Sequence, residues 1–318
     1  MRVLVTGGAG FIGSHLCARL LERGDEVTAL DNFDPFYPER LKRRGIDPLL
    51  RSGMRLVTAD IRDEAAMESA FRESRPETVV HLAALAGVRP SLERPSAYMD
   101  VNVRGTAVLL DAARKANVRR FIFGSSSSVY GQGAEPPFRE TARIDSPLSP
   151  YAASKAAGEL LARTFHNLYG KETICLRFFT VYGPRQRPDL AIHKFSRLML
   201  AGKKLPFFGD GASRRDYTYV DDIVAGVLAA IDRPLTYDVV NLGGAHTTSL
   251  RELIALLEEA LGIPAQLDLQ PFQPGDMPLT SADVTHAGEV LGYAPRTSMR
   301  EGLRKFAEWI RGEGRDFV

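Results

Sequence analysis

Tyr151 and Lys155 are the two side chains of this chain best suited to proton transfer, because they stand four residues apart in the segment YAASK. On a helix, that spacing puts both side chains on one face, one turn apart. A tyrosine with its ordinary pKa of about 10 is a poor base at neutral pH, but a neighbouring ammonium favours the phenolate. Such a pair would accept the proton of an alcohol. Taken alone, it is equally a chance pair on a surface helix.

A glycine-rich segment near the start, TGGAGFIGSH, is the second feature that carries chemistry. Its Gly7, Gly10 and Gly13 follow a strand-like run and precede a helical one, so the backbone can turn tightly against a pyrophosphate and offer the N–H groups of a helix N-terminus. Asp31 ends the next strand-like run, 18 residues past Gly13. A carboxylate there accepts the hydroxyls of an adenosine ribose and repels a 2′-phosphate, which predicts NAD rather than NADP. Together with the proton-transfer pair, this indicates removal of a hydroxyl proton and a C–H hydride.

The ends of the third and fourth predicted strands offer further contacts to the cofactor. Asp60 and Ile61 would bracket the adenine, although Asp60 or Asp63 would equally cap the helix that follows. His81, inside VVHLAA, is interpreted as a core residue with satisfied hydrogen bonds. The expected backbone wall of the cofactor site is Leu82, Ala83 and Ala84.

Four consecutive serines open the segment SSSSVYG (125–131), directly after the apolar run FIF. They are either a polar strand end whose hydroxyls satisfy nearby backbone groups or a source of hydroxyls for catalysis. We keep the first interpretation for Ser125 and partly for Ser128.

These residues have to be positioned by an alternation of short β-branched runs and longer helical patterns. Several of the runs are almost continuously apolar, as in parallel strands buried on both faces, and the alternation predicts a doubly wound α/β sheet. The predicted strands are 2–7, 26–31, 55–60, 78–84, 120–126, 174–179 and 237–244, and the predicted helices between them are Phe11–Arg23, Glu64–Glu73, Tyr98–Asn117 and Ala152–Tyr169.

After Phe179 the elements become shorter and Pro and Gly more frequent. Ser249 and Glu252 form a capping box ahead of a helix that reaches residue 261, and a last helix covers about 298–311. We expect a smaller mixed α/β domain for the substrate, formed by about 178–213 plus 243–318. Residues 1–177 plus about 214–242 would then form the cofactor-binding domain.

Composition is that of an ordinary globular protein, with 44% hydrophobic and 25% charged residues among 318. The net charge of +2 is too weak to indicate a nucleic-acid partner, and the most basic stretch, RLKRRG (40–45), is interpreted as a solvated face. Cys17 and Cys175 each lie in an apolar run, which favours reduced, buried thiols. No signal peptide or membrane-length apolar run is seen. We expect a cytoplasmic protein without a membrane or metal partner.

The chain resembles the extended short-chain dehydrogenases/reductases that act on nucleotide sugars. The resemblance covers nearly its whole length through TGGAGFIGSH, DNF, HLAALAGV, SSSSVYG, YAASK, LRFFTVYGPRQRPD, FFGDGASRRDYTYVDD and QPGDMP, in the order of the family. It implies a Rossmann domain, tightly held NAD, a nucleotide diphosphate sugar across the domain cleft, and a homodimer through a four-helix bundle made from Tyr98–Asn117 and Ala152–Tyr169. It adds Phe11, Ile12, Asn32 and Asn102 to the expected cofactor contacts, and it makes Ser126 the catalytic hydroxyl beside Tyr151 and Lys155.

Within that family, the serine segment separates the reactions. The 4,6-dehydratases have a segment resembling T-D-E before VYG, and the UDP-glucuronate decarboxylases have a glutamate there. This chain has Ser126, Ser127 and Ser128 and no carboxylate. The resemblance therefore implies a 4-epimerase, in which the hydride leaves C4 and returns to the opposite face of a 4-keto sugar.

The segment RFFTVYGPRQRPDLA (177–191) looks most like UDP-glucuronate 4-epimerases, with Thr180 where UDP-glucose 4-epimerases have Asn. Oxidising glucuronate at C4 makes a β-keto acid that loses CO₂ easily, so its carboxylate has to be held. Ser127, Thr180 and either Arg185 or Arg187 suit that task, since arginine binds carboxylates bidentately.

Two further substrate contacts are implied by the family, namely Arg215 for the diphosphate and Asp276 for the nucleotide ribose. Arg89 either reaches the sugar or lies at the surface. The alternatives are a UDP-glucose or UDP-N-acetylhexosamine 4-epimerase and a non-catalytic NAD-binding regulator, although such regulators lose the Tyr/Lys pair that this chain keeps.

Overall fold

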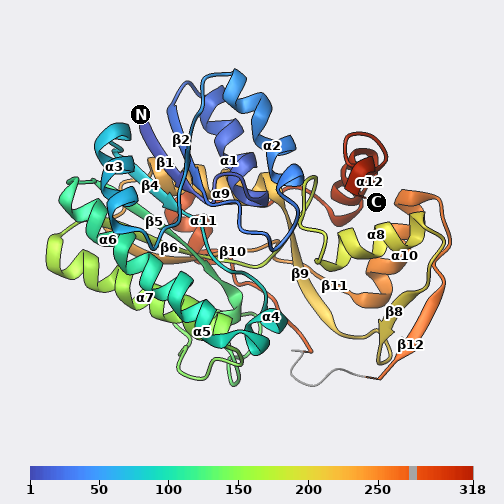
Figure 1. Cartoon of the computed structure of the whole chain (residues 1–318). Helices are drawn as coiled ribbons and strands as arrows, with labels where there is room; N and C mark the ends of the chain where they lie inside the picture. The colour runs from blue at the N-terminus through green and yellow to red at the C-terminus, as the bar shows by residue number, and fades with distance from the viewer. Residues whose placement is uncertain (272–277, 318) are drawn as a thin grey trace.

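A computed structural model describes residues 1–271 and 278–317. Its centre is a seven-stranded sheet in the order β10-β6-β5-β4-β1-β2-β3, in which every neighbouring pair is parallel (Figure 1). The predicted doubly wound sheet is confirmed. Its strands are β1 (Arg2–Thr6), β2 (Glu26–Asp31), β3 (Arg55–Thr58), β4 (Thr78–His81), β5 (Arg120–Ser126), β6 (Glu172–Phe178) and β10 (Tyr237–Leu242).

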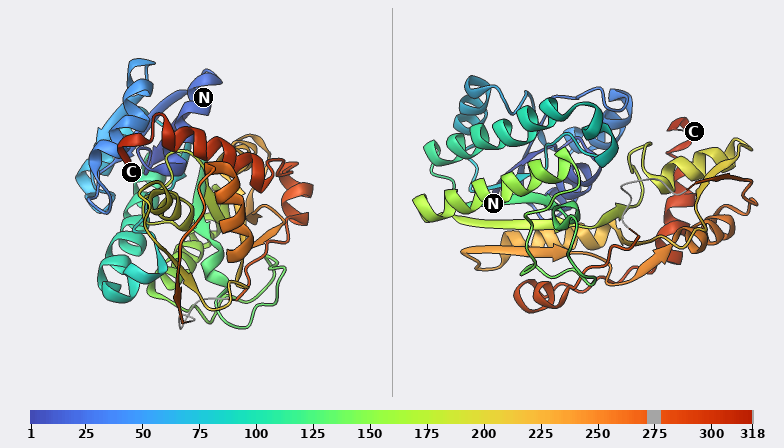
Figure 2. Two further views of the ribbon diagram at one scale, coloured as in Figure 1. Left: turned by 90° about the vertical axis from the view of Figure 1, so that its right-hand side faces the viewer. Right: turned by 90° about the horizontal axis from the view of Figure 1, so that it is seen from below.

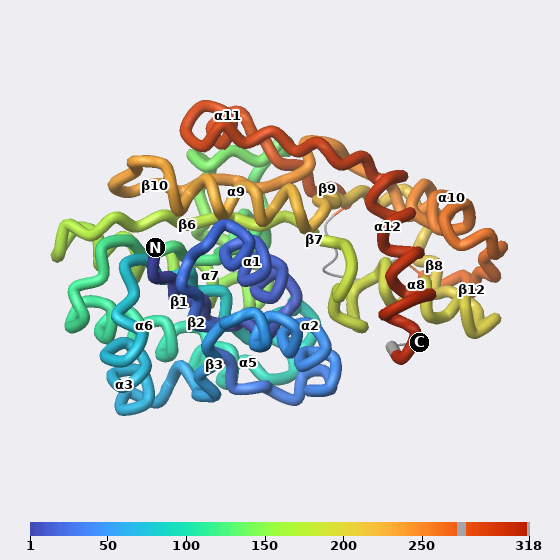
Figure 3. Tube along the Cα trace, turned by 90° about the horizontal axis from the view of Figure 1, so that it is seen from above, coloured from blue at the N-terminus to red at the C-terminus, as the bar shows by residue number. Residues whose placement is uncertain are grey.

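Helices cover both faces of this sheet. On one face, α1 (Phe11–Glu22) and α9 (Val220–Asp232) lie side by side, with α2 (Glu39–Arg51) against α1 (Figure 3). On the other face, α3 (Glu64–Ser74), α6 (Gly105–Lys115) and α7 (Pro150–Tyr169) pack over a second apolar core. Parallel strands covered in this way are apolar on both sides. Cys17 and Cys175 are buried free thiols in these two cores, as predicted.

The segment predicted as a single helix from Tyr98 to Asn117 is divided. After α4 (Val88–Glu93) and α5 (Pro95–Tyr98), the chain makes a π-helical stretch, Met99–Arg104, before α6 begins. Wide turns of this kind interrupt the regular hydrogen bonding of a helix and often occur beside functional sites.

The second part of the molecule lies beyond one end of the central sheet (Figure 2). It contains a three-stranded sheet in the order β11-β9-β7 and a two-stranded sheet of β12 and β8. Its helices α8, α10 and α12 gather around them, and the predicted capping box of Ser249 and Glu252 is present at the start of α10. The elements are β7 (Thr180–Tyr182), α8 (Ala191–Leu200), β8 (Leu205–Phe208), β9 (Arg214–Tyr219), β11 (Thr247–Ser249), α10 (Leu250–Leu261), β12 (Leu267–Gln270), α12 (Met299–Arg311) and the short 3₁₀ turn Arg315–Phe317. Helix α11 (Thr285–Leu291) instead packs against β10 and α9 of the central part.

One strand falls outside the expected division of the chain. Residues 214–219 were expected to belong with the cofactor domain, but β9 pairs with β7 and β11 in the small sheet. The chain returns to the central layers only with α9 and β10. Strand β9 buries Asp216, Thr218 and Tyr219 and leaves its other three residues partly exposed, unlike the fully buried central strand β5.

The buried carboxylate of Asp216, on β9 of the three-stranded sheet, binds the backbone of two segments that come later in the chain. Its Oδ1 accepts the Gly244 N–H at 2.6 Å and its Oδ2 accepts the Ala282 N–H at 3.0 Å. Within the described part of the chain, no helix has both the length and the apolar character needed to cross a bilayer.

Candidate active site

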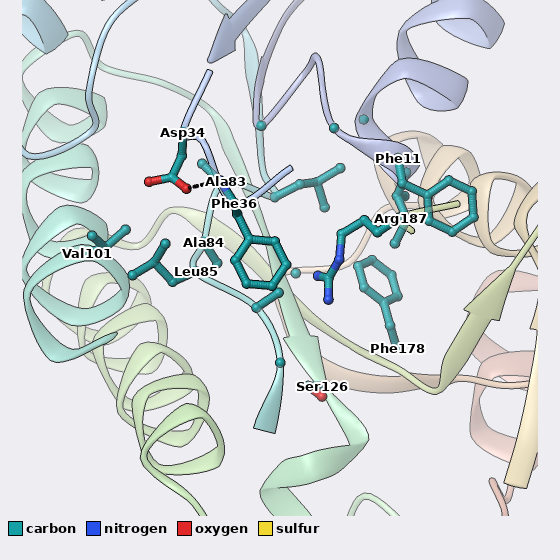
Figure 4. A pocket seen from close by; sticks show the side chains of 18 of the residues that line it. Phe11, Asp34, Phe36, Ala83, Ala84, Leu85, Val101, Ser126, Phe178 and Arg187 are labelled. Carbon is teal, nitrogen blue, oxygen red and sulfur yellow. Dashed lines mark hydrogen bonds between the residues drawn. The ribbon is translucent and has the colours of Figure 1, made fainter. Parts of the chain in front are cut away.

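A cavity of about 470 Å³ lies where the carboxyl ends of the central strands face the second part of the molecule (Figure 4). This is the position at which doubly wound sheets bind ligands. Most of the predicted site residues line it: Gly7, Gly10, Phe11, Ile12, Gly13, Asp31, Asn32, Asp60, Ile61, Leu82, Ala83, Ala84, Ser126, Ser127, Tyr151, Lys155, Thr180 and Arg187. One cavity therefore gathers the glycine loop, the Tyr/Lys pair and the serines.

The glycine loop has the geometry of a phosphate cradle. Gly7 takes a left-handed φ of 68°, and a Cβ at Gly13 would lie 2.1 Å from the Gly7 carbonyl oxygen. Helix α1 begins at Phe11 with no side-chain cap, so its first N–H groups face the cavity side unclaimed by a side chain. Bare backbone and a helix N-terminus fit the pyrophosphate of a dinucleotide.

Asp31 is buried at the end of β2 and already supports the loop. Its Oδ2 accepts the Ala9 N–H at 3.1 Å, and its Oδ1 accepts the Phe33 N–H at 2.9 Å. Lys42 forms an ion pair with the same Oδ1 at 3.3 Å. The basic stretch around residue 42 is therefore not wholly a solvated face, because the Lys42 side chain is only 8% exposed. Helical periodicity turns this one lysine of α2 inward, toward the carboxylate.

Asp60 and Asn32 lie together at the adjoining strand ends. The Asn32 amide donates to Asp60 Oδ2 at 3.0 Å, and hydrogen bonds from Arg62 lower the pKa of Asp60 to about 2. Asp63, not Asp60, caps α3 by accepting the Ala66 N–H. The Asp60 carboxylate thus remains at the cavity wall.

The Tyr/Lys pair sits on the first turns of α7. Ser149 caps this helix and Pro150 starts it, which places Tyr151 and Lys155 on the face toward the cavity. Lys155 Nζ donates to the Gly124 carbonyl oxygen at 2.7 Å. Burial lowers the pKa of Lys155 to about 8, while the charge of Glu159 opposes that fall.

The tyrosine differs from the expectation. Tyr151 was expected to have its pKa lowered by the neighbouring ammonium. Instead, burial raises the pKa of Tyr151, and a hydrogen bond with Ser126 opposes the rise in part. Removing the phenolate from water costs more than the surrounding dipoles and charges return.

The serine run splits into two roles in space. Ser125 also lines the cavity, but its hydroxyl donates to Glu159 Oε1 at 2.6 Å, a structural contact to a buried side chain rather than to nearby backbone. Ser126 ends β5, caps the 3₁₀ turn Ser127–Tyr130 by accepting the Ser128 N–H, and lines the cavity with Ser127. The hydroxyls at the turn are therefore presented to a ligand.

Arg187 is the arginine that reaches the cavity. Its guanidinium lies 5.0 Å from the centre of the Phe36 ring and pairs with Asp189 at 2.8 Å, and Figure 4 shows it among Phe11, Phe36 and Phe178. The pairing uses Nε and Nη2, so the remaining edge of the guanidinium is available.

Arg185 does not line this cavity. Its backbone takes a left-handed φ of 63°, and its guanidinium donates to the Gly45 carbonyl oxygen at 3.1 Å. It thereby fastens the loop after β7 to α2. Of the two arginines left open by the sequence, the structure brings only Arg187 to the site.

Two other predicted residues, Asn102 and Arg215, do not line the cavity. Asn102 is buried in the π-helical stretch and bonds both backbone groups of Leu85, so it holds the wall in place. Arg215 lies on β9 and donates to the carbonyl oxygen of Arg214. Asp276 lies outside the described residues. His81 is a satisfied core histidine, as predicted, bonded to Thr6 and Thr106.

Sequence reasoning missed the segment between β2 and α2. Asp34, Phe36 and Tyr37 from this segment line the cavity, as does Phe178 at the end of β6. The signal was the aromatic pattern FDPFY (33–37), directly after Asp31 and Asn32. The chain that leaves a ligand-binding strand end has to pass close to the ligand, so its side chains contribute to the wall of the site.

Comparison with known proteins gives consistent matches. Residues 3–243 match the family model described as NAD dependent epimerase/dehydratase family. A UDP-glucuronate 4-epimerase of Thermodesulfobacterium geofontis is 40% identical over 310 residues, covering 97% of this chain and 95% of that protein.

Two solved structures are similar over the same range. UDP-glucuronic acid 4-epimerase from Bacillus cereus, in complex with UDP-glucuronic acid and NAD, has a TM-score of 0.91 at 37% identity, covering 98% of this chain and 99% of the other. UDP-glucose 4-epimerase from Thermotoga maritima with UDP-glucose has a TM-score of 0.90 at 37% identity with the same coverage. The expected relationship is confirmed, and the chain belongs to the NAD dependent epimerase/dehydratase family.

Proposed function

We propose that the protein is an NAD-dependent epimerase that inverts C4 of UDP-glucuronate to give UDP-galacturonate. The observation that carries the proposal is the composition of the cavity around Tyr151, where Ser126, Ser127, Thr180 and Arg187 offer hydroxyls and a cation. The cavity-lining acids among the described residues, Asp31, Asp34 and Asp60, lie at or just after the ends of strands β2 and β3. A second acid for dehydration or decarboxylation is therefore missing from the described wall beside the tyrosine.

The residues around the central sheet would hold NAD. The Gly7–Gly13 loop and the start of α1 suit its pyrophosphate, and Asp31 with Asn32 suits the adenosine ribose. Asp31 keeps lone pairs for ribose hydroxyls beside its backbone contacts. When bound, oxidised NAD would supply a positive charge and, in its nicotinamide ring, a reversible acceptor for the hydride from C4 of the sugar. The second part of the molecule, with Arg215 and Asp276 as proposed contacts, would hold the UDP-sugar.

Tyr151 would accept the O4 proton as the C4 hydride departs, and return it after the hydride comes back to the other face. Burial raises the pKa of Tyr151, and the ammonium of Lys155 would offset this when it faces the phenolate, because an ammonium stabilises a neighbouring anion. Ser126 would hold O4 through its hydroxyl. The sugar is oxidised and reduced in turn, so the enzyme would end each cycle unchanged.

The glucuronate carboxylate would be held by Arg187 with Ser127 and Thr180. A β-keto acid loses CO₂ when the bond to its carboxylate aligns with the ketone π system. Fixing the carboxylate away from that alignment protects the intermediate. The mostly buried Arg187 suits this role, since its pairing with Asp189 leaves one guanidinium edge for a second carboxylate.

Incubation with NAD and UDP-glucuronate, followed by NMR of the sugar, tests the proposal. We expect UDP-galacturonate and little 4-keto pentose, the product of decarboxylation. In Tyr151→Phe we expect turnover to fall roughly a hundredfold or more, since the proton acceptor is lost, while NAD binding persists. Rapid epimerisation of UDP-glucose without any UDP-galacturonate would overturn the substrate, and full activity in Tyr151→Phe would remove that residue from the mechanism.

We further propose that the enzyme works as a homodimer in the cytoplasm. Leu160, Leu168 and Tyr169 are exposed on α7, where the packing with α6 would supply two helices of a four-helix bundle. The buried free thiols suit a reducing compartment.

A further inference from the structure

A buried ion pair lies directly behind Lys155. Glu159 stands one turn further along α7, and its Oε2 pairs with Arg177 Nη2 of β6 at 2.8 Å, both side chains being at most 5% exposed. Arg177 Nε donates to Glu159 Oε1 at 2.9 Å, and the Ser125 hydroxyl donates to the same oxygen at 2.6 Å. Both oxygens of this carboxylate are therefore engaged by Arg177 and Ser125.

The consequence for Lys155 is that Glu159 lies close without binding it. Residues four apart share a helix face, and an uncommitted glutamate at this position would pair with the ammonium. Lys155 Nζ instead donates to Gly124 and lies 5.1 Å from the centre of the Phe123 ring. An ammonium has three N–H donors, so two remain for groups on the cavity side.

Glu159 is the negative charge that acts on Lys155, because the histidine, cysteine and tyrosine nearby are uncharged at neutral pH. Burial keeps the pKa of His81 on β4 at about 3, so it stays neutral. Burial also raises the pKa of Cys175 on β6 and that of Tyr237 on β10, the latter to about 12, and both remain uncharged near neutral pH. Burial disfavours the charged form of Lys155, and among these described groups it is the carboxylate of Glu159 that favours the charged form.

We propose that Glu159 is a positioning residue for the Tyr151–Lys155 pair. Arg177 and Ser125 hold its carboxylate so that it keeps Lys155 charged without occupying the ammonium. The ammonium is then free to face Tyr151 and the cofactor. The catalytic part of this inference rests on the proposed epimerase function, whereas the charge of Lys155 can be measured without any turnover.

Glu159→Gln keeps the shape of the side chain and removes its charge. The ε-carbon of Lys155 is followed by ¹³C NMR across pH in labelled protein, with its signal assigned from Lys155→Arg. We expect its titration midpoint to fall by about one pH unit, as for loss of a nearby opposite charge. An unchanged midpoint in Glu159→Gln would overturn the proposal.

Glu172→Gln is the matched control. Glu172 on β6 pairs with buried Arg120 on β5 at 2.8 Å. This ion pair lies at the opposite end of the two strands from Ser125 and Arg177, the partners of Glu159. Glu172→Gln should alter stability while leaving the Lys155 titration and the pH profile of turnover in place. A shift equal to that of Glu159→Gln would mean that any loss of charge in this sheet acts on Lys155.

Two further measurements complete the test. The basic limb of the pH profile for turnover of UDP-glucuronate should move down with the Lys155 midpoint in Glu159→Gln. Absence of turnover in the unaltered protein would count against the proposed function and leave the NMR result standing.

Glu159→Gln could fail to fold because Arg177 is left unpaired. In that case the double variant Glu159→Gln/Arg177→Met removes both charges. The titration midpoint of Lys155 in the double variant should lie between those expected for the unaltered protein and the single variant. A midpoint equal to that of the unaltered protein would overturn the proposal there too.

Discussion

Arg187 and Arg185 stand two residues apart in the loop after β7 and face different surroundings. In Arg187→Met, we expect kcat/KM for UDP-glucuronate to fall roughly 10- to 100-fold, the effect of losing a hydrogen-bonded charge on an anion. Arg185→Met is the control, since this side chain contacts Gly45 outside the cavity. Both variants are assayed with UDP-glucuronate and UDP-glucose. An equal loss on the two sugars in Arg187→Met would show that Arg187 does not bind the carboxylate.

Residues whose role follows from local spacing were predictable from the sequence. The glycine loop and the pair of Tyr151 and Lys155 are examples, because a strand–turn–helix or one helical turn fixes their geometry. The direction of Arg185 was not, since it depends on a left-handed backbone conformation at that residue. The inward side chain of Lys42 follows from the periodicity of α2, a helix that was not predicted from the sequence. The stacking of Phe36 on Arg187 depends on an irregular segment, for which sequence offers no period.

The junction of β1 and α1 depends on the absence of a side chain at Gly13. In Gly13→Ala, the new Cβ would lie 2.1 Å from the Gly7 carbonyl oxygen, so the cradle has to open. We expect NAD affinity to fall at least about tenfold, measured by calorimetric titration, while the fold persists. Gly288→Ala in α11 is the matched control, because its nearest neighbour would be 3.7 Å away. Unchanged NAD affinity in Gly13→Ala would remove the loop from the cofactor site.

Elements with strong periodicity were predicted well, and those shaped by tertiary contacts were not. The helix predicted from Phe11 begins at that residue, as does the one from Glu64. The π-helical stretch at Met99–Arg104 contains Asn102, whose side-chain amide hydrogen-bonds to Leu85, a residue outside that helix. The pairing of β9 with β7 is likewise a contact between segments that no local pattern encodes.

The whole molecule should lose stability in acid through two buried histidines, His81 and His193, and the half-buried His15. Burial lowers the pKa of His15 and His81 to about 3 and that of His193 to about 4. The unfolded chain binds protons at these sites from about pH 6.5 downward, so it is favoured as pH falls toward 4. We expect a loss of about 1.4 kcal/mol per pH unit for each histidine between pH 6 and 4. Urea unfolding at several pH values measures this, and a flat stability over that range would contradict it.

Assembly is the last property at this scale, and it depends on α7. Leu160 is 66% exposed and Leu168 68% exposed on this helix, and apolar side chains left in water at the surface favour a protein interface. For a chain of 35.0 kDa, light scattering after gel filtration should give twice that mass. In Leu160→Glu, a charge would be buried in the bundle, so we expect monomers. Leu269→Glu is the control, since Leu269 is 74% exposed on β12, away from α7. A dimer that survives Leu160→Glu but not Leu269→Glu would place the interface on the two-stranded sheet of β8 and β12 instead.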